Sequence, residues 1–301
     1  SVALTGSTAD LAAALAGTFA AAYTGNVTIT DANATSIAAT DISTINSSTT
    51  GTITVTNNIN ITGTAAEVAA AVGNVDTFAG SPTATLSNAH TLAELKAINN
   101  ATSGTITLND YTVALAGSSS DLAAALAGSF SSSYTGTVTI TNADYTVAQL
   151  KAINNATTGA ITLSTTNTNL TGTAGDLVSA FAGTITTHTG DITITDTPTS
   201  AQLAIIDAAT TGTITYSEGG GGGGDDHITG TSAQVIEVLQ SKSDYTGNIT
   251  ITDTPTLAQL KTINNATSGT ITLNDYSVAL TGSTADLAAA LAGTFAAAYT
   301  G

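Results

Sequence analysis

A glycine run followed by two acidic residues is the stretch whose residue types are best suited to binding a metal ion. Residues 219–224 are six consecutive glycines, and Asp225 and Asp226 follow them directly. Residues 221–228 fit the pattern Gly-Gly-x-Gly-x-Asp-x-apolar, in which turn carbonyls and Asp side chains hold Ca²⁺. The sequence therefore contains one candidate Ca²⁺ site.

Two interpretations of this stretch follow. In the first, Gly222, Gly224 and Asp226 are ligands of Ca²⁺, which is the one candidate cofactor. In the second, residues 218–230 form an inserted Gly-rich loop, because glycine runs behave as flexible linkers. A phosphate-binding loop is not expected, because the Gly-Lys-Ser/Thr that would open a helix is missing.

Acidic residues also recur where the predicted strands end. Asp31, Asp196 and Asp253 follow one kind of strand, and Asp110 and Asp275 follow the other. If successive strands stack, these carboxylates could align and hold cations between turns. The alternative is a local Asx turn that leads into the next helix, because Asp side chains bond to backbone groups two residues on.

The three histidines, His90, His188 and His227, lie in unlike sequence contexts. No pattern of partner residues surrounds them. We expect them to be surface residues rather than metal ligands.

Charge and composition exclude several classes of function. The chain has 21 acidic residues against four lysines and a net charge of −17, so a nucleic-acid partner is not expected. It has no cysteine, which removes disulfides, thiolate metal sites and cysteine nucleophiles. No apolar run approaches the ~20 residues of a membrane span. The cations are Lys96, Lys151, Lys242 and Lys261. Without clustered carboxylates beside cations, we do not expect an enzyme.

The elements that would position these residues belong to a repeated unit. Residues 98–110 recur without change at 263–275, and a near copy occupies 153–163. The pattern predicts the end of a helix, a tight turn and a strand. We expect Asn99 and Asn100 to end the helix, because Asn tolerates the left-handed conformation of a C-cap.

Two kinds of helix are predicted, and each opens with a side-chain cap. Capping boxes of the Thr-x-x-Glu/Gln type begin the helices of the short units, and Ser/Thr-x-x-Asp begins those of the long units. The boxes begin at Thr91, Thr146, Thr199 and Thr256, and the second kind of cap is at Ser7, Ser118 and Thr173. Apolar residues at Leu92, Leu95 and Ile98 mark one buried helical face.

The predicted strands alternate apolar residues with threonine, as in Val27-Thr28-Ile29. This period places the apolar side chains inward and a row of threonines outward. Because a helix separates successive strands, the sheet should be parallel with right-handed crossovers. We predict a right-handed α/β solenoid of about ten strand–helix units over residues 1–301. It would be a single continuous segment of alternating long and short units, with one parallel sheet and helices on one face.

The two ends of the sequence repeat each other. Residues 1–25 are identical to residues 277–301, which gives a super-period of 276 residues (277 − 1). The chain begins and ends within a repeat, without a polar cap. Because uncapped solenoids expose unpaired edges, we expect end-to-end self-association.

Several phrases of the sequence resemble a known group of proteins. Residues 8–17, 144–159 and 253–260 are similar to repeats of giant extracellular surface proteins of marine picocyanobacteria of the Synechococcus type. The resemblance implies a location outside the cell or at its surface, and a structural or adhesive role. It supplies no catalytic residues.

Together these features predict a structural repeat segment of a secreted filament, a surface layer or a giant adhesin, with cell-surface polysaccharide as a candidate partner. The alternative is a solenoid module that binds Ca²⁺, carbohydrate or ice. The outward threonines motivate the ice-binding alternative, although threonine also suits any solvated strand face.

Overall fold

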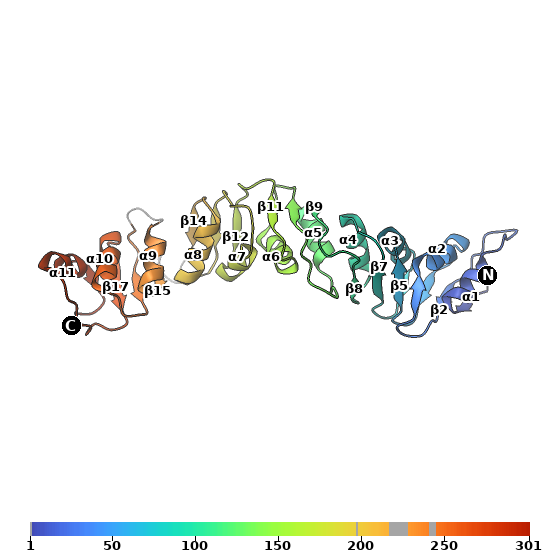
Figure 1. Ribbon diagram of the computed structural model, residues 1–301, viewed down its shortest axis with the longest axis horizontal. Helices are drawn as coiled ribbons and strands as arrows, with labels where there is room; N and C mark the ends of the chain where they lie inside the picture. Colours follow the sequence, from blue (N-terminus) through green and yellow to red (C-terminus); the bar gives the residue numbers. More distant parts are fainter. Residues whose placement is uncertain (1, 197, 217–227, 241–244) are drawn as a thin grey trace. The chain divides into compact units, whose positions relative to one another are not determined.

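The computed structural model describes residues 2–196, 198–216, 228–240 and 245–301. Short helices and short strands alternate along the chain (Figure 1). They form two compact units. The first contains residues up to 145, 152–165 and 183–185, and the second contains 146–151, 166–182 and 186–301.

The described helices each span two to three turns. They are α1 (Thr8–Leu15), α2 (Ala39–Ser48), α3 (Ala65–Gly73), α4 (Leu92–Ala101), α5 (Ser119–Leu126), α6 (Val147–Ala156), α7 (Ala174–Ala180), α8 (Ser200–Ala209), α9 (Ser232–Gln240), α10 (Leu257–Ala266) and α11 (Thr284–Leu291). The predicted caps are confirmed. For example, Thr91 accepts from the Glu94 backbone N–H at 3.3 Å, and the Glu94 carboxylate accepts from the Thr91 N–H at 2.8 Å. None of the described helices is long and apolar enough to cross a membrane.

The strands form short sheets in which neighbours are parallel. The first sheet is β1 (Leu4–Gly6), β2 (Val27–Ile29), β4 (Ile53–Val55) and β6 (Thr77–Phe78), and the second is β3 (Ser36–Ala38), β5 (Asn60–Gly63), β7 (Thr83–Leu86) and β8 (Ile106–Thr107). The third is β9 (Leu115–Gly117), β10 (Val138–Ile140) and β11 (Ile161–Leu163). In the second unit lie β12 (Leu170–Gly172), β13 (Ile192–Ile194) and β14 (Ile214–Tyr216), and then β15 (Ile228–Gly230), β16 (Ile249–Ile251), β17 (Thr270–Leu273) and β18 (Thr294–Phe295).

One helix separates every two strands that pair, as α6 separates β10 from β11. This confirms the predicted parallel strands joined through helices, because a parallel pair needs a crossover connection. We call the stretch from one strand to its partner, such as residues 138–160, a coil. Partner strands are 21–26 residues apart, for example Ile228 and Ile249, or Val27 and Ile53.

The described strands do not form the one continuous sheet that the sequence predicts. Two strands, rather than one, lie between most consecutive helices, and they join different sheets: β4 belongs to the first sheet and β5 to the second. The additional strand precedes the helix, and in β5, β9, β12 and β15 it ends in Leu/Ile-Thr/Ala-Gly, as at Leu170–Gly172. Each sheet therefore stops after three or four strands while the next begins.

The core lies between the inward face of the strands and the apolar face of the helices. Ile29 and Ile53 on strands and Leu95 and Ile98 on α4 are fully buried. Thr28, between the buried Val27 and Ile29, is partly exposed, so the predicted alternation is confirmed.

The helices run past the predicted Asn stop. Both Asn99 and Asn100 are helical, α4 ends at Ala101, and Thr102 is the C-cap with an extended backbone (φ −139°, ψ 144°). The prediction was wrong because the Asn99 amide bonds to another helix and does not require a left-handed turn. It donates to the Ala124 carbonyl of α5 at 2.5 Å.

Candidate functional site

The predicted Ca²⁺ ligands Gly222, Gly224 and Asp226 lie outside the described residues. The predicted loop 218–230 is described only at its end, where Ile228–Gly230 is strand β15 and pairs with β16. Within the described ranges, no group of three or more His, Cys, Asp or Glu side chains could hold a metal ion.

The acidic residues after the strands cap helices one coil away. Asp31 Oδ2 accepts from the Thr8 backbone N–H at 2.7 Å and also from its hydroxyl. Asp253 binds Ser232 in the same way, with the backbone N–H at 2.7 Å. Asp196 accepts from the N–H of Ala174 at 2.7 Å. Each carboxylate therefore satisfies an orphan donor at the positive end of a helix, which explains its recurrence without a bound cation.

Asparagine side chains cap two further helices in the same way. Sequence reasoning based on charge did not identify these residues. Asn88 Oδ1 accepts from the Ala65 N–H, and Asn142 Oδ1 from the Ser119 N–H, both at 2.7 Å. An uncharged side chain is thus sufficient at this position.

Asp110 and Asp275 behave as the Asx-turn interpretation expects. Asp110 Oδ1 accepts from the backbone N–H of Thr112 at 2.8 Å and from its hydroxyl at 2.7 Å, and Asp275 binds Ser277 alike. These bonds hold the pKa of both carboxyl groups below its usual range.

The described lysines each form an ion pair with the acid in the first turn of the next helix. The pairs are Lys96 with Asp121, Lys151 with Asp176 (2.5 Å) and Lys261 with Asp286 (2.7 Å). Hydrogen bonds from the lysines lower the pKa of these carboxyl groups. Because the same acids lie at helix N-termini, each ion pair joins two adjacent coils. All three described lysines are therefore engaged in ion pairs.

After α2, α4, α6, α8 and α10, a threonine links its coil to the one before it. Thr157 Oγ1 donates to the Gly136 carbonyl at 2.9 Å and accepts from the Gly159 N–H at 3.0 Å. The same two bonds are formed by Thr49, Thr102, Thr210 and Thr267. Thr157 and Gly136 are buried, so the hydroxyl of Thr157 provides a partner for a buried backbone carbonyl.

Glycines stack at the same corner. A Cβ on Gly159 would lie 2.2 Å from the carbonyl oxygen of Gly136, and one on Gly212 would lie 2.0 Å from that of Gly190. Only glycine lets the backbones of consecutive coils approach this closely. The glycine that repeats in the sequence is therefore required by coil-to-coil contact.

The first Asn of the Asn-Asn pair reaches the following helix. Asn264 Nδ2 donates to the Ala289 carbonyl at 2.7 Å, which repeats the bond of Asn99. The side chain is pressed against a glycine, because a Cβ on Gly293 would lie 1.7 Å from Asn264 Oδ1.

The prediction that the histidines are surface residues is wrong for the two that the structure describes. His90 is 3% exposed and His188 is fully buried. Each stands where another repeat has tyrosine: His90 directly precedes Thr91 as Tyr145 precedes Thr146, and His188 lies two residues before Gly190. His188 also forms a parallel bridge with Thr210, one coil on, as tyrosine does elsewhere in the chain.

The buried position of His90 favours its neutral form, because burial lowers its pKa. Its Nε2 lies 3.3 Å from the Tyr134 hydroxyl, which itself donates to the Val113 carbonyl at 2.6 Å, so Nε2 carries the proton. Its Nδ1 is buried without a hydrogen-bond partner. Burial lowers the pKa of His90, and the charges of Asp110 and Glu94 oppose this only in part. Burial also raises the pKa of Tyr134.

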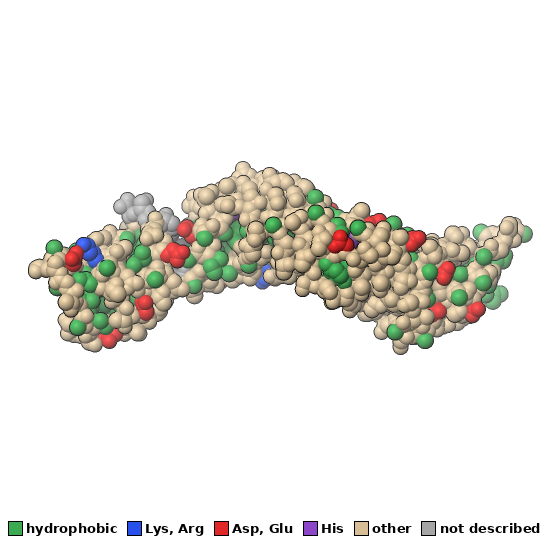
Figure 2. Space-filling model, viewed as in Figure 1, with side chains coloured by type: hydrophobic (Ala, Val, Ile, Leu, Met, Phe, Trp, Pro, Cys, Tyr) green, Lys and Arg blue, Asp and Glu red, His purple; other side chains and the backbone are tan. Residues whose placement is uncertain are grey.

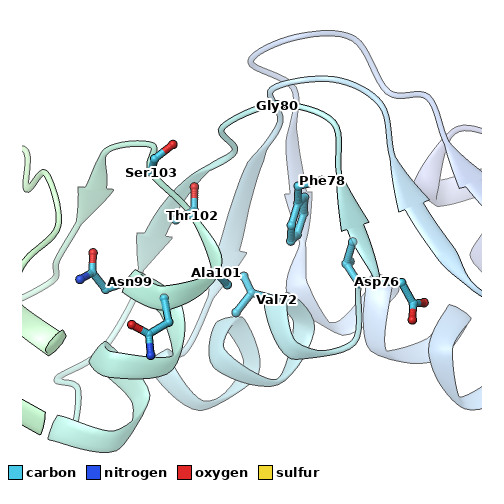
Figure 3. A pocket seen from close by; sticks show the side chains of 10 residues that line it. Val72, Asp76, Phe78, Gly80, Asn99, Ala101, Thr102 and Ser103 are labelled. Carbon is cyan, nitrogen blue, oxygen red and sulfur yellow. The ribbon is translucent and has the colours of Figure 1, made fainter.

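A pocket of about 510 Å³ lies beside the end of α4 (Figure 3). Phe78 and Gly80 line one side, and Thr102 and Ser103 line the other. Its carboxylate, Asp76, is turned away from the Asn99 side of the pocket and accepts from the Ile53 N–H at 2.7 Å. The lining thus offers hydroxyl and amide groups but no carboxylate directed into the space.

The outward threonines stack in register within each sheet. Thr5, Thr28, Thr54 and Thr77 form one row across the first sheet. Because the sheets are separate, the rows are short. Acidic side chains are scattered over the visible face, and few basic ones accompany them (Figure 2).

Comparison with known proteins finds no match to a protein-family model, to a curated protein or to a solved structure.

Proposed function

We propose that the chain is a structural repeat segment of a secreted filament, a surface layer or a giant adhesin, located outside the cell or at its surface. In this proposal the coils form a right-handed α/β solenoid with helices on one face, and the segment associates end to end.

The observation that carries the proposal is the use of the distinctive side chains for contact between coils. Asp31 caps a helix of the preceding coil, Lys151 pairs with the helix of the next, and Thr157 bonds to the preceding corner. The acidic, basic and hydroxyl side chains that could take part in catalysis or metal binding are therefore used for contacts between neighbouring coils. A chain of this kind derives its stability from the stacking of neighbours.

The charge distribution supports a solvated exterior. The net charge of −17 is spread over the repeats, and the three described lysines are in ion pairs. Such a surface repels phosphate backbones and anionic lipid. It leaves neutral, hydroxyl-rich polysaccharide at the cell surface as a partner whose chemistry fits the threonine rows. The proposal assigns no catalytic activity.

Sedimentation velocity of the 301-residue chain over a wide concentration range tests self-association. In a buffer of marine ionic strength, with and without Ca²⁺, the proposal predicts a sedimentation coefficient that grows with concentration. A single monomeric species at every concentration would refute it.

The in-register threonine rows favour a second candidate, a carbohydrate- or ice-binding module. Rows of hydroxyls at strand spacing could meet a regular array of ligand oxygens. Replacing Thr28 and Thr54 by Val would abolish such binding, measured by glycan retention or by ice recrystallisation, while the fold is preserved. Binding of Ca²⁺ by residues 221–228 belongs to this alternative and is tested by calorimetric titration with the Asp226→Asn variant as control.

A further inference from the structure

Two pockets in the first compact unit are lined by equivalent residues of different repeats. The pocket of about 510 Å³ beside the end of α4 is lined by Phe78 and Thr102 (Figure 3). A second pocket, of about 290 Å³, lies beside the end of α6 and is lined in the same way by Phe130 and Thr157. Because the lining recurs, it is a property of the repeat rather than of one loop.

Each lining combines a buried apolar side chain with a phenylalanine ring. Val72 and Leu126 are buried near the ends of α3 and α5. Phe78 and Phe130 are only half-buried, so part of each ring is accessible. The face of an aromatic ring carries partial negative charge and attracts the C–H groups of a ligand.

An asparagine amide is the second shared feature. Asn100 lines the first pocket and Asn155 the second, and both residues are exposed. The preceding Asn99 bonds to α5, but the amides of Asn100 and Asn155 form no hydrogen bond with any described residue. An amide can both donate and accept, so it suits a ligand hydroxyl in either role.

A hydroxyl and the last helical carbonyls complete the polar side of each pocket. Ser103 and Thr158 are exposed and follow the C-cap threonines directly. The Ser103 hydroxyl lies 2.7 Å from that of Ser81 and has capacity for a further bond. α4 ends at Ala101 and α6 at Ala156, and the last carbonyls of a helix lack an intrahelical partner and form the negative end of its dipole. This side therefore favours hydroxyl donors and disfavours anions.

The lining residues direct no charged side chain into either pocket. Asp76 belongs to the first lining, and its carboxylate accepts from the Ile53 N–H at 2.7 Å. In the second lining, the Tyr134 hydroxyl donates to the Val113 carbonyl at 2.6 Å. A ligand that suits both pockets is therefore neutral, rich in hydroxyl groups and apolar on one face.

We propose that each of the two pockets binds one ring of a neutral sugar. The phenylalanine contacts the C–H face of the sugar ring, and the asparagine amide and the neighbouring hydroxyl bond to its hydroxyl groups. The two volumes lie in or at the lower limit of the range of ligand pockets, roughly 300–1,000 Å³. Only the choice of a polysaccharide as the source of the sugar rests on the proposed function.

The chain contains a natural comparison for both features. Ile185 takes the place of Phe130 after the next long helix and forms the same kind of parallel bridge. Ala208 takes the place of Asn155 before the Ala-Thr at the end of the following short helix. The fold accepts isoleucine and alanine at these positions, so it does not require the ring and the amide for the stacking of coils.

NMR of the 301-residue chain with ¹³C-labelled phenylalanine tests the proposal, because the chain has only five phenylalanines. The neutral probes are methyl glucoside and the hexasaccharides of glucose, mannose and xylose, and the anionic probe is hexagalacturonate. We expect saturable shifts of the Phe78 and Phe130 signals with a neutral probe. The other three phenylalanines, and all five in the presence of hexagalacturonate, should not shift. Stronger binding of a hexasaccharide than of methyl glucoside would identify a polysaccharide as the source, and equal binding a free sugar; both outcomes support the pockets.

Two double variants separate the ring from the amide. Phe78→Ile/Phe130→Ile removes both rings but introduces the residue type that the chain has at Ile185. We expect calorimetric titration with the tightest neutral probe to show affinity about three- to tenfold lower, with thermal unfolding unchanged. Asn100→Ala/Asn155→Ala should also weaken binding without a loss of stability.

The control variant Thr28→Val/Thr54→Val changes a threonine row and neither pocket. It should bind the sugar as tightly as the natural chain. Loss of binding in this control, with binding retained when both rings are removed, would overturn the pockets and assign the sugar to the threonine rows. Absence of shifts with every neutral probe at millimolar concentration would also overturn the proposal.

These outcomes are distinguishable from failure of the proposed function. Sedimentation velocity should show the same self-association for the natural chain and for the variant that lacks both rings. If self-association occurs but no sugar binds, the pockets are wrong and the structural role stands. If the sugar binds in the pockets of a chain that stays monomeric, the pockets stand and end-to-end association is wrong.

Discussion

The hydroxyl of Thr157 donates to the carbonyl of Gly136, 21 residues earlier, at 2.9 Å. The same hydroxyl accepts from the Gly159 N–H, so one buried side chain satisfies backbone groups of two consecutive coils. The arrangement recurs after four other helices. Threonine at this position therefore connects consecutive coils through hydrogen bonds.

Thr157→Val removes the hydroxyl but keeps the shape of the side chain. The buried Gly136 carbonyl and the partly buried Gly159 N–H then lose this partner, and we expect the free energy of unfolding to fall by about 1–3 kcal/mol. Urea denaturation followed by circular dichroism measures this. Thr157→Ser is the control, because it retains the hydroxyl and should cost less. Equal losses for Val and Ser would show that the methyl group, rather than the hydrogen bonds, matters.

Gly159→Ala tests the close approach of the backbones at the corner. The added Cβ would lie 2.2 Å from the Gly136 oxygen, so the coils must separate and we expect a loss of about 1–3 kcal/mol in the free energy of unfolding. The matched control is Gly73→Ala, since nothing lies within 4 Å of a Cβ at that position. It should leave stability unchanged or slightly raised. A neutral Gly159→Ala would contradict the stacked corner.

Asp31→Asn and Asp31→Ala separate helix capping from cation binding. Because Asn88 and Asn142 cap equivalent helices, the Asn variant should retain stability, whereas Ala should lose about 1 kcal/mol. Thermal unfolding with Ca²⁺ and with EDTA is the measurement. A Ca²⁺-dependent stabilisation that the Asn variant loses would favour a cation ladder instead.

Acid should destabilise the fold in two windows. The pKa of His90 and His188 is lowered from 6.5 by burial, so below about pH 6.5 the unfolded chain binds more protons than the folded chain. The contribution of these two histidines to the free energy of unfolding is therefore fully present above that pH. It is lost as the pH falls through their pKa values in the folded state. The pKa of Asp121 is lowered from 3.8, chiefly by Lys96, so its contribution is lost only below that value.

The variant His90→Tyr/His188→Tyr isolates the first window, because tyrosine occupies equivalent positions at Tyr145 and Tyr134. Denaturation between about pH 7.5 and pH 5 should show a smaller pH dependence than the natural chain. An unchanged slope of the free energy of unfolding against pH would mean that groups other than His90 and His188 cause the pH dependence.

Sequence patterns predicted the elements that depend on local chemistry. The capping boxes at Thr91 and Thr256 and the alternation at Val27–Ile29 follow from contacts within a few residues. The division into several sheets was missed, because the additional strands are only three or four residues long. The available signal was the Leu-Thr-Gly or Leu-Ala-Gly that directly precedes Ser7, Ser118 and Thr173, the caps of the helices in the long units.

The candidate site was predictable only as a set of residue types. Whether Asp31 binds a cation or caps a helix depends on which donor lies 23 residues away in sequence, and local spacing does not contain that information. His188 was misplaced for a related reason. Alignment of His188-Thr189-Gly190 with Tyr134-Thr135-Gly136 would have shown that this histidine occupies a buried aromatic position.

Electron microscopy of the 301-residue chain at rising concentration tests the central claim most directly, since a structural segment that associates end to end forms linear assemblies. We predict unbranched filaments of constant width whose length increases with concentration. Dispersed single molecules at every concentration, or shapeless aggregates, would contradict the account.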